Sequence, residues 1–235
     1  MNKIDIIIPA YNEEHRISDT LSQYANFFSN NTQLTIVLNG CTDNTHEIVK
    51  LFQQDHPEII SIINIPEAIG KGAAIIEGWK KSTADIVGFV DADNATQPDE
   101  FEKLIKTIDG HDGVIASRFL PESQIINRQS TLRTIMSRAY ILFVKLLFQL
   151  PYSDTQCGAK LFKRNVIQRI LPELKHADMS FDVELLWKLK KAQTDIIEIP
   201  TIWVDKPGSA MLGSTGNFLK TGANMLAKLA KLRFF

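Results

Sequence analysis

The chain has 235 residues, of which 44% are hydrophobic and 23% are charged, and its formal net charge is −1. These values are typical of a globular protein with one large α/β domain or two small ones. The near-neutral charge provides no basic field of the kind that attracts nucleic acid. The two cysteines, Cys41 and Cys157, cannot form a disulfide framework, which favours a reducing compartment.

The sequence carries neither a signal-peptide pattern nor a membrane span. The apolar run at residues 4–8 is too short for the hydrophobic part of a signal peptide. The longest apolar stretch, residues 139–150, is interrupted by Lys145 and is shorter than the roughly 18 residues that a spanning helix needs. We therefore expect a cytoplasmic protein that can lie on a membrane surface but does not cross it.

Short apolar runs alternate with helical patterns in the first half of the chain. Because these runs are apolar throughout, they predict strands buried on both faces, as in a parallel sheet flanked by helices. The predicted strands are Ile4–Ile8, Leu34–Leu38, Ile59–Ile63, Ile86–Val90 and Val114–Ala116. The predicted helices are Glu13–Phe28, Asn44–Gln54, Gly72–Lys81 and Pro98–Ile108. Ligands should bind at the carboxyl edge of such a sheet.

The second half has a different pattern. A helix over Thr131–Leu150 begins basic and becomes apolar, and a polar loop follows at Tyr152–Gly158. A helix over Phe181–Ala192 and a short strand over Ile196–Ile199 come next. The end of the chain, Gly216–Arg233, is an amphipathic helix. Its apolar face carries Phe218, Met225, Leu226, Leu229 and Leu232, and its polar face carries Lys220, Asn224, Lys228 and Lys231.

Three polar loops follow predicted strands or open predicted helices. Asp91 and Asp93 come directly after a buried strand, where two carboxylates can hold a hard cation such as Mg²⁺ or Mn²⁺. A solvated turn that caps the next helix would explain them as well. Asp43 could bind a base or ribose, or only cap a helix. Gly70, Lys71 and Gly72 could face a diphosphate, or form an ordinary glycine turn.

Two further polar motifs lie in the second half. The segment Asp154–Gly158 could be a simple polar turn. Asp182 and Glu184 stand in the first turn of a helix, where the helix dipole alone would favour acidic residues. No single motif decides the function, whereas their order along the chain is informative.

In that order the motifs resemble the inverting family-2 glycosyltransferases with the GT-A fold, in the branch that loads sugars onto polyprenyl or dolichyl phosphate. The resemblance covers nearly the whole chain. The matching segments are IPAYNEE (8–14), NGCTDNT (39–45), GKGAA (70–74), DAD (91–93), ASRF (116–119), DTQCGAKLF (154–162) and FDVELLWKL (181–189). The segments DADNAT and IPTIWVDKPGS resemble the glucosyl members of the branch, and Ala95 replaces a glutamine of the mannosyl members.

The resemblance implies a fold and a division of labour. We expect a single GT-A domain over residues 1–235, Rossmann-like, with a mostly parallel sheet flanked by helices. Residues 1–118 would bind the nucleotide sugar, residues 119–215 the acceptor, and residues 216–235 would form the C-terminal amphipathic helix.

The resemblance also implies roles for individual residues. The nucleotide sugar, with UDP-glucose favoured, would be held by Pro9, Tyr11, Glu13, Asp43, Lys71, Asp91 and Gln156. Asp91 and Asp93 would bind the metal, Mg²⁺ or Mn²⁺. The acceptor phosphate would contact Arg118, Arg133 and Ser137. The catalytic set would be Asp93, Asp154, Asp182 and Arg118. Asp154 and Asp182 would orient the sugar or the arginines.

A polyprenyl phosphate acceptor would place the protein on the inner face of a membrane. The helix from Thr131 could then lie at the interface, with its apolar residues beside Arg138 and Lys145. Burial of this helix in the core is the alternative. The C-terminal helix could dock on a membrane, on the domain or on a second copy of the chain in a homo-oligomer.

Three other functions stay open at the level of sequence. A family-2 enzyme with a polysaccharide or other hydroxyl acceptor would need a general base. A sugar-nucleotide-binding protein without turnover would bind the donor only. A nucleotidyltransferase would have a glycine-rich phosphate loop near the amino terminus, which this sequence lacks. The resemblance leaves glucose, mannose and other hexoses to be distinguished, because a few contacts decide among them.

Overall fold

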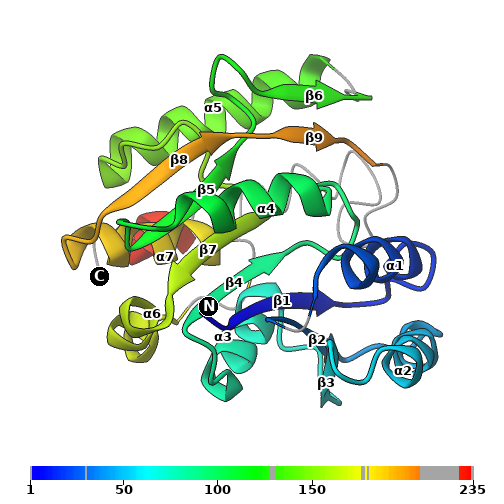
Figure 1. The fold of residues 1–235 in the computed structure, drawn as a ribbon. Coiled ribbons are helices and arrows are strands. Elements are labelled where there is room, and N and C mark those ends of the chain that lie inside the picture. Colours follow the sequence, from blue (N-terminus) through cyan, green and yellow to red (C-terminus); the bar gives the residue numbers. More distant parts are fainter. Residues whose placement is uncertain are drawn as a thin grey trace.

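The computed structural model describes residues 2–29, 31–127, 131–175, 178, 180–206 and 228–233, and for residues 131–137 it describes the backbone alone. Within these residues a seven-stranded sheet has the order β3-β2-β1-β4-β7-β5-β8, and β6 pairs with β9 in a separate ribbon (Figure 1). The strands are β1 (Ile4–Ala10), β2 (Thr32–Asn39), β3 (Ile60–Ile65), β4 (Ile86–Val90), β5 (Gly113–Ser117), β6 (Gln124–Ile126), β7 (Ala159–Lys163), β8 (Ile196–Pro200) and β9 (Ile202–Val204).

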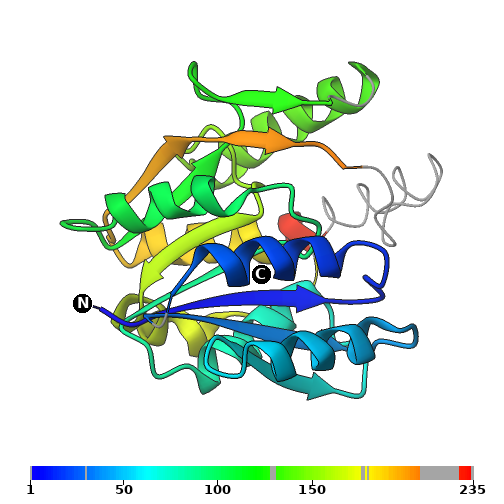
Figure 2. The same cartoon turned by 45° about the vertical axis from the view of Figure 1, so that its right-hand side comes forward.

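Helices cover both faces of the main sheet. They are α1 (Ile17–Phe27), α2 (Thr45–Asp55), α3 (Lys71–Lys81), α4 (Pro98–Thr107), α5 (Thr131–Phe148), α6 (Arg164–Ile170) and α7 (Phe181–Lys191), with a short 3-10 turn at Leu171–Glu173. Figure 2 shows α1, α2 and α4 in front of the sheet and α3, α6 and α7 behind it. The β6–β9 ribbon and α5 lie together beyond the β8 edge in both views. In the described part of the chain, no helix is long and apolar enough to cross a bilayer.

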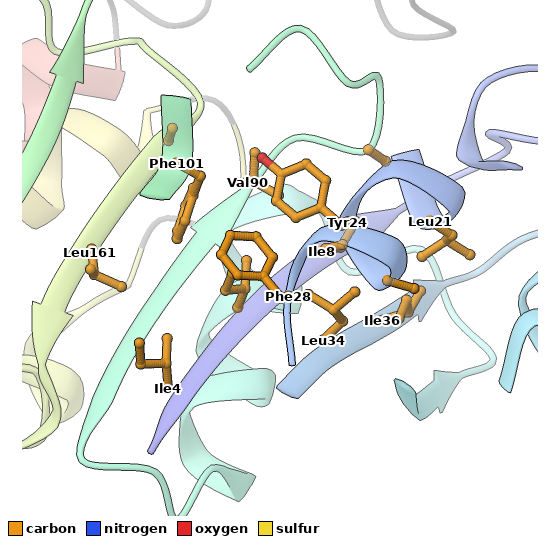
Figure 3. Close-up of a cluster of buried hydrophobic side chains, with 14 of the residues drawn as sticks. Ile4, Ile8, Leu21, Tyr24, Phe28, Leu34, Ile36, Val90, Phe101 and Leu161 are labelled. Carbon is orange, nitrogen blue, oxygen red and sulfur yellow. The ribbon is translucent and has the colours of Figure 1, made fainter. Parts of the chain in front are cut away.

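The layered arrangement follows from the burial of the strands on both faces. Side chains of β1 point alternately into two apolar cores, one under α1, α2 and α4 and the other under α3, α6 and α7. In the first core, Tyr24, Phe28 and Phe101 pack on strand residues such as Ile8 (Figure 3). The second core gathers Trp79, Phe89, Phe162 and Phe181 in ring contacts. The predicted parallel sheet flanked by helices is confirmed.

The strands and helices predicted in the first half are all present, and the largest difference is at the start of α1. The expected helix began at Glu13, whereas α1 begins at Ile17. The backbone N–H of Glu13 donates to Thr45 (2.7 Å) and that of Glu14 donates to Asp43 (3.1 Å). Residues 13–16 therefore form a turn that is tied to the start of α2.

Strand β7 was absent from the sequence prediction, and it decides the shape of the sheet. It runs antiparallel between β4 and β5, while β1 pairs in parallel with β2 and β4, and β5 with β8. Because β7 runs the other way, the loop before it lies at the same edge as the carboxyl ends of β4 and β5. This reversal brings residues 154–158 beside Asp91, whose N–H donates to the carbonyl of Gly158 (3.1 Å).

Helix α5 divides its apolar residues between two faces. Val144 and Phe148 are buried in the second core, and Ile141 is buried as well. Leu142, Phe143 and Leu146 are 59%, 38% and 73% exposed. Helix α5 is thus buried on one side and exposed on the other, and its placement at a membrane interface stays a prediction.

At the C-terminus, residues 228–233 form a helical turn that packs on the domain. Leu229 is fully buried in the second core, Leu232 packs against it, and Arg233 donates to the carbonyl of Leu147 (3.0 Å). The remaining part of the predicted amphipathic helix, residues 216–227, lies outside the described residues.

Candidate active site

A cavity of about 260 Å³ opens at the carboxyl edge of β1, β2 and β4. Its walls are the loops after these strands and the start of α3. The lining residues are Pro9, Ala10, Tyr11, Glu13, Arg16, Asn39, Ala68, Gly70, Lys71, Asp91, Ala92 and Asp93. The predicted carboxyl-edge site is thus present as a hollow bounded by loops from different strands.

Many of the predicted donor-binding residues meet in this cavity. Pro9 lines it from the end of β1, Tyr11 and Glu13 from the loop after β1, and Lys71 from the first residue of α3. Tyr11 is 38% exposed, so its ring is accessible to a ligand. Gly70 has a φ of 92°, a conformation that glycine adopts without strain and that turns the chain into α3.

Asp43 does not line the cavity. Its carboxylate accepts hydrogen bonds from the N–H and hydroxyl of Thr45 (3.0 and 2.6 Å) and from the N–H of Glu14 (3.1 Å). Although partial burial opposes the shift, these bonds lower the pKa of Asp43. In this structure Asp43 joins the turn before α1 to the start of α2.

The two carboxylates of the DAD motif have different neighbours. Lys71 Nζ lies 2.7 Å from Asp91 Oδ1. Asp91 Oδ2 lies against Gly158, where an added Cβ would come within 1.9 Å of it. Asp93 accepts a hydrogen bond from the N–H of Ala95 (3.1 Å), and Arg16 Nη1 lies 3.8 Å from Asp93 Oδ2. Burial, and then the charge of Asp91, raise the pKa of Asp93.

These residues fit a divalent cation. The donors are hard carboxylate oxygens, and burial, followed by the neighbouring charge of Asp91, raises the pKa of Asp93. A bound cation would favour the ionised form of both carboxylates. Within the described residues, no cluster of three or more His, Cys, Asp or Glu side chains could hold a metal ion. Asp91 and Asp93 are the two cavity carboxylates that could hold such a cation.

Behind the cavity, Lys71 is linked to two residues that do not line it. Lys71 Nζ lies 3.8 Å from Asp182 Oδ2, and Lys160 Nζ lies 2.6 Å from Asp182 Oδ1. Lys160 is 0% exposed and Asp182 is 1% exposed. Burial alone would lower the pKa of Lys71, but Asp91 and Asp182 raise it above its usual range. Asp182 is thus a buried neighbour of the cavity, reached through Lys71.

Arg118 and Asp154 form a second polar cluster at the same edge of the sheet. Arg118 donates from Nε and Nη2 to Asp154 (2.6 and 3.0 Å), and its guanidinium lies 5.0 Å from the ring centroid of Trp203. Asp154 also accepts N–H bonds from Arg118 and Gln156. Although burial opposes the shift, Arg118 holds the pKa of Asp154 below its usual range. Asp154 is fully buried, so its visible effect is to orient Arg118.

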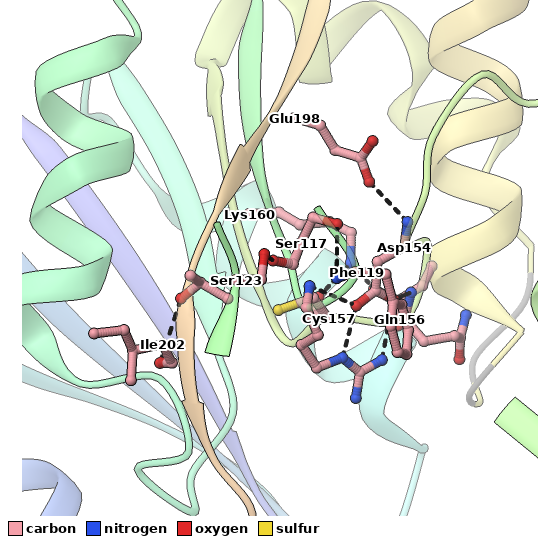
Figure 4. A network of polar contacts seen from close by, with 12 residues as sticks. Ser117, Phe119, Ser123, Asp154, Gln156, Cys157, Lys160, Glu198 and Ile202 are labelled. Atoms are coloured by element: carbon pink, nitrogen blue, oxygen red, sulfur yellow. Dashed lines mark hydrogen bonds and ion pairs between the residues drawn. The ribbon is translucent and has the colours of Figure 1, made fainter. Parts of the chain in front are cut away.

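The loop that carries Asp154 is held by Glu198 of β8. The carboxylate of Glu198 accepts the N–H groups of Ser153 (2.8 Å) and Asp154 (2.7 Å), as Figure 4 shows for Asp154. Gln156, predicted to contact the sugar, is half-buried in this loop, and its Nε2 has no hydrogen-bond partner among the described residues. The predicted acceptor contacts Arg133 and Ser137 lie in the part of α5 whose side chains are outside the described residues.

Sequence reasoning missed four residues of this region. Arg16 lines the cavity and pairs with Glu13 (2.6 Å). Asn39 accepts the N–H of Ile69 (2.7 Å) and so fixes the loop before α3. Lys160 pairs with Asp182, and Glu198 accepts the N–H groups of the loop that carries Asp154. The spacing of Glu13 and Arg16 was a usable signal, whereas Lys160 and Glu198 sit in strands that look ordinary in the sequence.

Solved structures identify the fold. Glucosyl-3-phosphoglycerate synthase from Mycobacterium tuberculosis, in complex with UDP, matches 98% of this chain and 79% of its own, with a TM-score of 0.72 and 15% identity. A mannosyltransferase from Pyrobaculum calidifontis, in complex with GDP-Man and Mn²⁺, matches 89% of this chain and 58% of its own, with a TM-score of 0.61 and 17% identity. The protein has the GT-A fold of glycosyltransferases.

The family follows from the sequence comparison. The model of glycosyl transferase family 2 matches residues 5–171, and the chain belongs to this family. A dolichyl-phosphate beta-glucosyltransferase of Trichomonas vaginalis is 33% identical over 87% of this chain and 65% of its own length. The Dictyostelium discoideum and human enzymes of the same name are 30% and 28% identical over 88% and 95% of this chain, and over 68% and 74% of their own lengths. The chain thus spans about two thirds of the length of the first two relatives.

Proposed function

We propose that this protein transfers glucose from UDP-glucose to the phosphate of a polyprenyl lipid, with inversion at the anomeric carbon. The observation that carries the proposal is the cavity in which Asp91, Asp93 and Lys71 meet the loop after β1, in a chain related to dolichyl-phosphate beta-glucosyltransferases.

The donor would bind in this cavity. Tyr11 and Pro9 offer apolar surface to the nucleoside, and Glu13 an acceptor for its polar groups. Lys71 would face the diphosphate. Asp91 and Asp93 would hold Mg²⁺ or Mn²⁺, which when bound offsets charge on the departing diphosphate. Fixed charges of this kind usually supply the largest part of the rate enhancement.

The acceptor explains why no general base is needed. The second pKa of a phosphate monoester is near 6, so the acceptor is mostly ionised at neutral pH and is already a nucleophile. It requires positioning and charge neutralisation. Arg118 suits this task because Asp154 holds its guanidinium in a fixed plane at the site edge. Arg133 and Ser137 are the further acceptor contacts that we propose.

The lipid acceptor would be met at a membrane surface. Leu142, Phe143 and Leu146 form an exposed apolar strip on α5, with Arg138 and Lys145 on the same helix. An apolar strip with flanking cations fits an interface that contains anionic lipid. We place the protein on the cytosolic face, because Cys41 and Cys157 are both free, as is usual for proteins in a reducing compartment.

Transfer of radiolabel from UDP-glucose to polyprenyl phosphate, measured in the organic phase with Mg²⁺ or Mn²⁺, tests the proposal. GDP-mannose and an Asp93→Ala variant run alongside, with Asp99→Ala as the control because Asp99 lies outside the cavity lining, in the first turn of α4. We expect metal-dependent label from UDP-glucose that Asp93→Ala loses and Asp99→Ala keeps. Label from GDP-mannose alone would overturn the choice of sugar, and absence of lipid label with every donor would overturn the acceptor.

A further inference from the structure

Lys71 pairs with one oxygen of the Asp91 carboxylate, because Asp91 Oδ1 is 2.7 Å from Lys71 Nζ. Asp91 Oδ2 lies against Gly158, where an added Cβ would come within 1.9 Å of it. A divalent cation held by Asp91 would lie close to the ammonium group of Lys71, and like charges at short distance repel in a partly buried site.

Lys71 has a second carboxylate within reach. Asp182 Oδ2 lies 3.8 Å from Lys71 Nζ, on the side away from solvent. The other oxygen of Asp182 receives Lys160 at 2.6 Å. Lys71 and Lys160 also lie over the ring of Phe89, at 5.5 and 5.2 Å from its centroid. The two lysines thus share Asp182 between them.

Lys160 has no access to the cavity and is held in place on several sides. It is 0% exposed, and its Nζ also donates to the carbonyl of Cys157 (2.6 Å). A buried, unpaired lysine would destabilise the folded state, so the ion pair with Asp182 is needed to accommodate Lys160 in this position. Because Lys160 pairs with one oxygen of Asp182, it offsets part of the negative charge that attracts Lys71.

We propose that Lys160 and Asp182 are positioning residues for Lys71. When a divalent cation binds Asp91, Lys71 moves closer to Asp182, which becomes its main ion-pair partner. The affinity of the site for the cation then depends on how strongly Asp182 attracts Lys71 relative to Asp91. This inference rests on the proposed donor site, and it is independent of the identity of the sugar and of the lipid.

The proposal predicts effects of opposite sign from the two partners of one ion pair. In Asp182→Asn, Lys71 has Asp91 as its remaining ion-pair partner and competes more strongly with the cation. The Mn²⁺ concentration for half-maximal UDP binding should therefore rise about fivefold or more, the range typical of coupled binding. In Lys160→Met, Asp182 attracts Lys71 more strongly, so this concentration should fall below that of the wild type. A defect that merely loosened the structure would raise it in both variants.

Calorimetric titration of UDP at graded Mn²⁺ concentrations measures these values without any turnover. Lys80→Met is the control, because Lys80 is an exposed lysine of the same helix that pairs with Glu77. The double variant Lys160→Met/Asp182→Asn removes both buried charges together, and it should behave as Asp182→Asn does. It serves as the test if Lys160→Met alone does not fold.

The outcomes separate this inference from the proposed function. If Asp182→Asn and the double variant need the same Mn²⁺ concentration as the wild type, Asp182 does not take over Lys71 when the cation binds. That result would overturn the inference while leaving the donor site intact. A shift in the same direction in both single variants would overturn it as well. Absence of Mn²⁺-dependent UDP binding in the wild type would overturn the donor site itself.

Discussion

At the scale of single residues, the contact between Gly158 and Asp91 has a direct consequence. In Gly158→Ala, the new Cβ would lie 1.9 Å from Asp91 Oδ2, so Asp91 must turn away or the loop must withdraw. We expect Mn²⁺-dependent UDP binding to weaken about tenfold or more, with a stability loss of about 1–3 kcal/mol from overpacking. Calorimetry measures the first effect and urea unfolding the second.

Gly110→Ala is the matched control. Gly110 has a φ of +85°, but nothing lies within 4 Å of an added Cβ there. This variant should lose about 1 kcal/mol of stability through backbone strain and keep its affinity for UDP. Equal losses of UDP affinity in both variants would contradict the role that we give to Gly158.

Asp5 offers a test of pH dependence away from the site. It is 3% exposed in β1, and burial raises its pKa although hydrogen bonds with Ser82 and Thr35 oppose the shift. At neutral pH the folded state therefore carries the cost of a buried charge. As pH falls through the raised pKa toward the ordinary value of 3.8, the folded state takes up a proton and the cost disappears.

Asp5→Asn should accordingly stabilise the protein at pH 7, and the gain should shrink as pH falls toward 4. Urea unfolding of both proteins across this range provides the measurement. A gain of equal size at every pH would show that the charge of Asp5 is not the cause.

Motif residues were easier to predict than the residues that support them. Asp91, Asp93 and Lys71 follow strands or open helices, where backbone geometry makes polar loops visible in the sequence. Asp154 and Arg118 were singled out as well, and orienting an arginine was one of the two roles expected for Asp154. Which arginine it contacts depends on the register between β5 and β7. Lys160 and Glu198 could not be found, since a lone charge in a short strand gives no sign of a buried partner.

At the scale of elements, α5 offers a test of the proposed membrane docking, because its exposed and buried apolar residues are distinct. Leu142→Gln/Leu146→Gln changes only exposed side chains, so its thermal midpoint should stay close to that of the wild type. Its binding to vesicles with anionic lipid should fall severalfold, as measured by co-sedimentation. Unchanged sedimentation of the double variant would contradict membrane docking by α5.

Val144→Ala is the complementary variant on the same helix. Val144 is fully buried in the second core, so its truncation should cost about 1–3 kcal/mol in urea unfolding. Vesicle binding of the folded variant should be unchanged. The pair of variants thus separates the two faces of α5.

Elements with strong periodicity were predicted well, and short elements that depend on tertiary contacts were not. The strand β4 was predicted with its observed ends, Ile86–Val90. In contrast, β6, β7, β9 and α6 were missed. The strands β6 and β9 have only three residues each, and charged residues interrupt the apolar pattern of β7 and α6. The antiparallel direction of β7 could not be read from sequence because it is set by pairing with β4 and β5 on either side.

At the scale of the whole molecule, the two functional halves proposed from the sequence share one sheet. β7 comes from residues 119–215, yet it lies between β4 and β5 of residues 1–118. Removing either half would leave strands without neighbours, so we expect both halves to unfold together.

Urea unfolding followed by two signals tests this expectation. Tryptophan fluorescence reports on Trp79 in the first half and on Trp187 and Trp203 in the second, and circular dichroism reports on all helices. The two transitions should coincide, and a Trp79→Phe variant should show the same midpoint by both signals. Separate transitions would mean that the halves are independent units.

The most direct test of the central claim is the structure of the reaction product. The lipid product formed from UDP-glucose and polyprenyl phosphate can be isolated from a preparative reaction and examined by mass spectrometry and by NMR of its anomeric proton. The account predicts a β-linked glucosyl phosphodiester, because an ionised phosphate displaces UDP from the α-linked donor with inversion. An α-linked product, or glucose attached to a hydroxyl group, would contradict it.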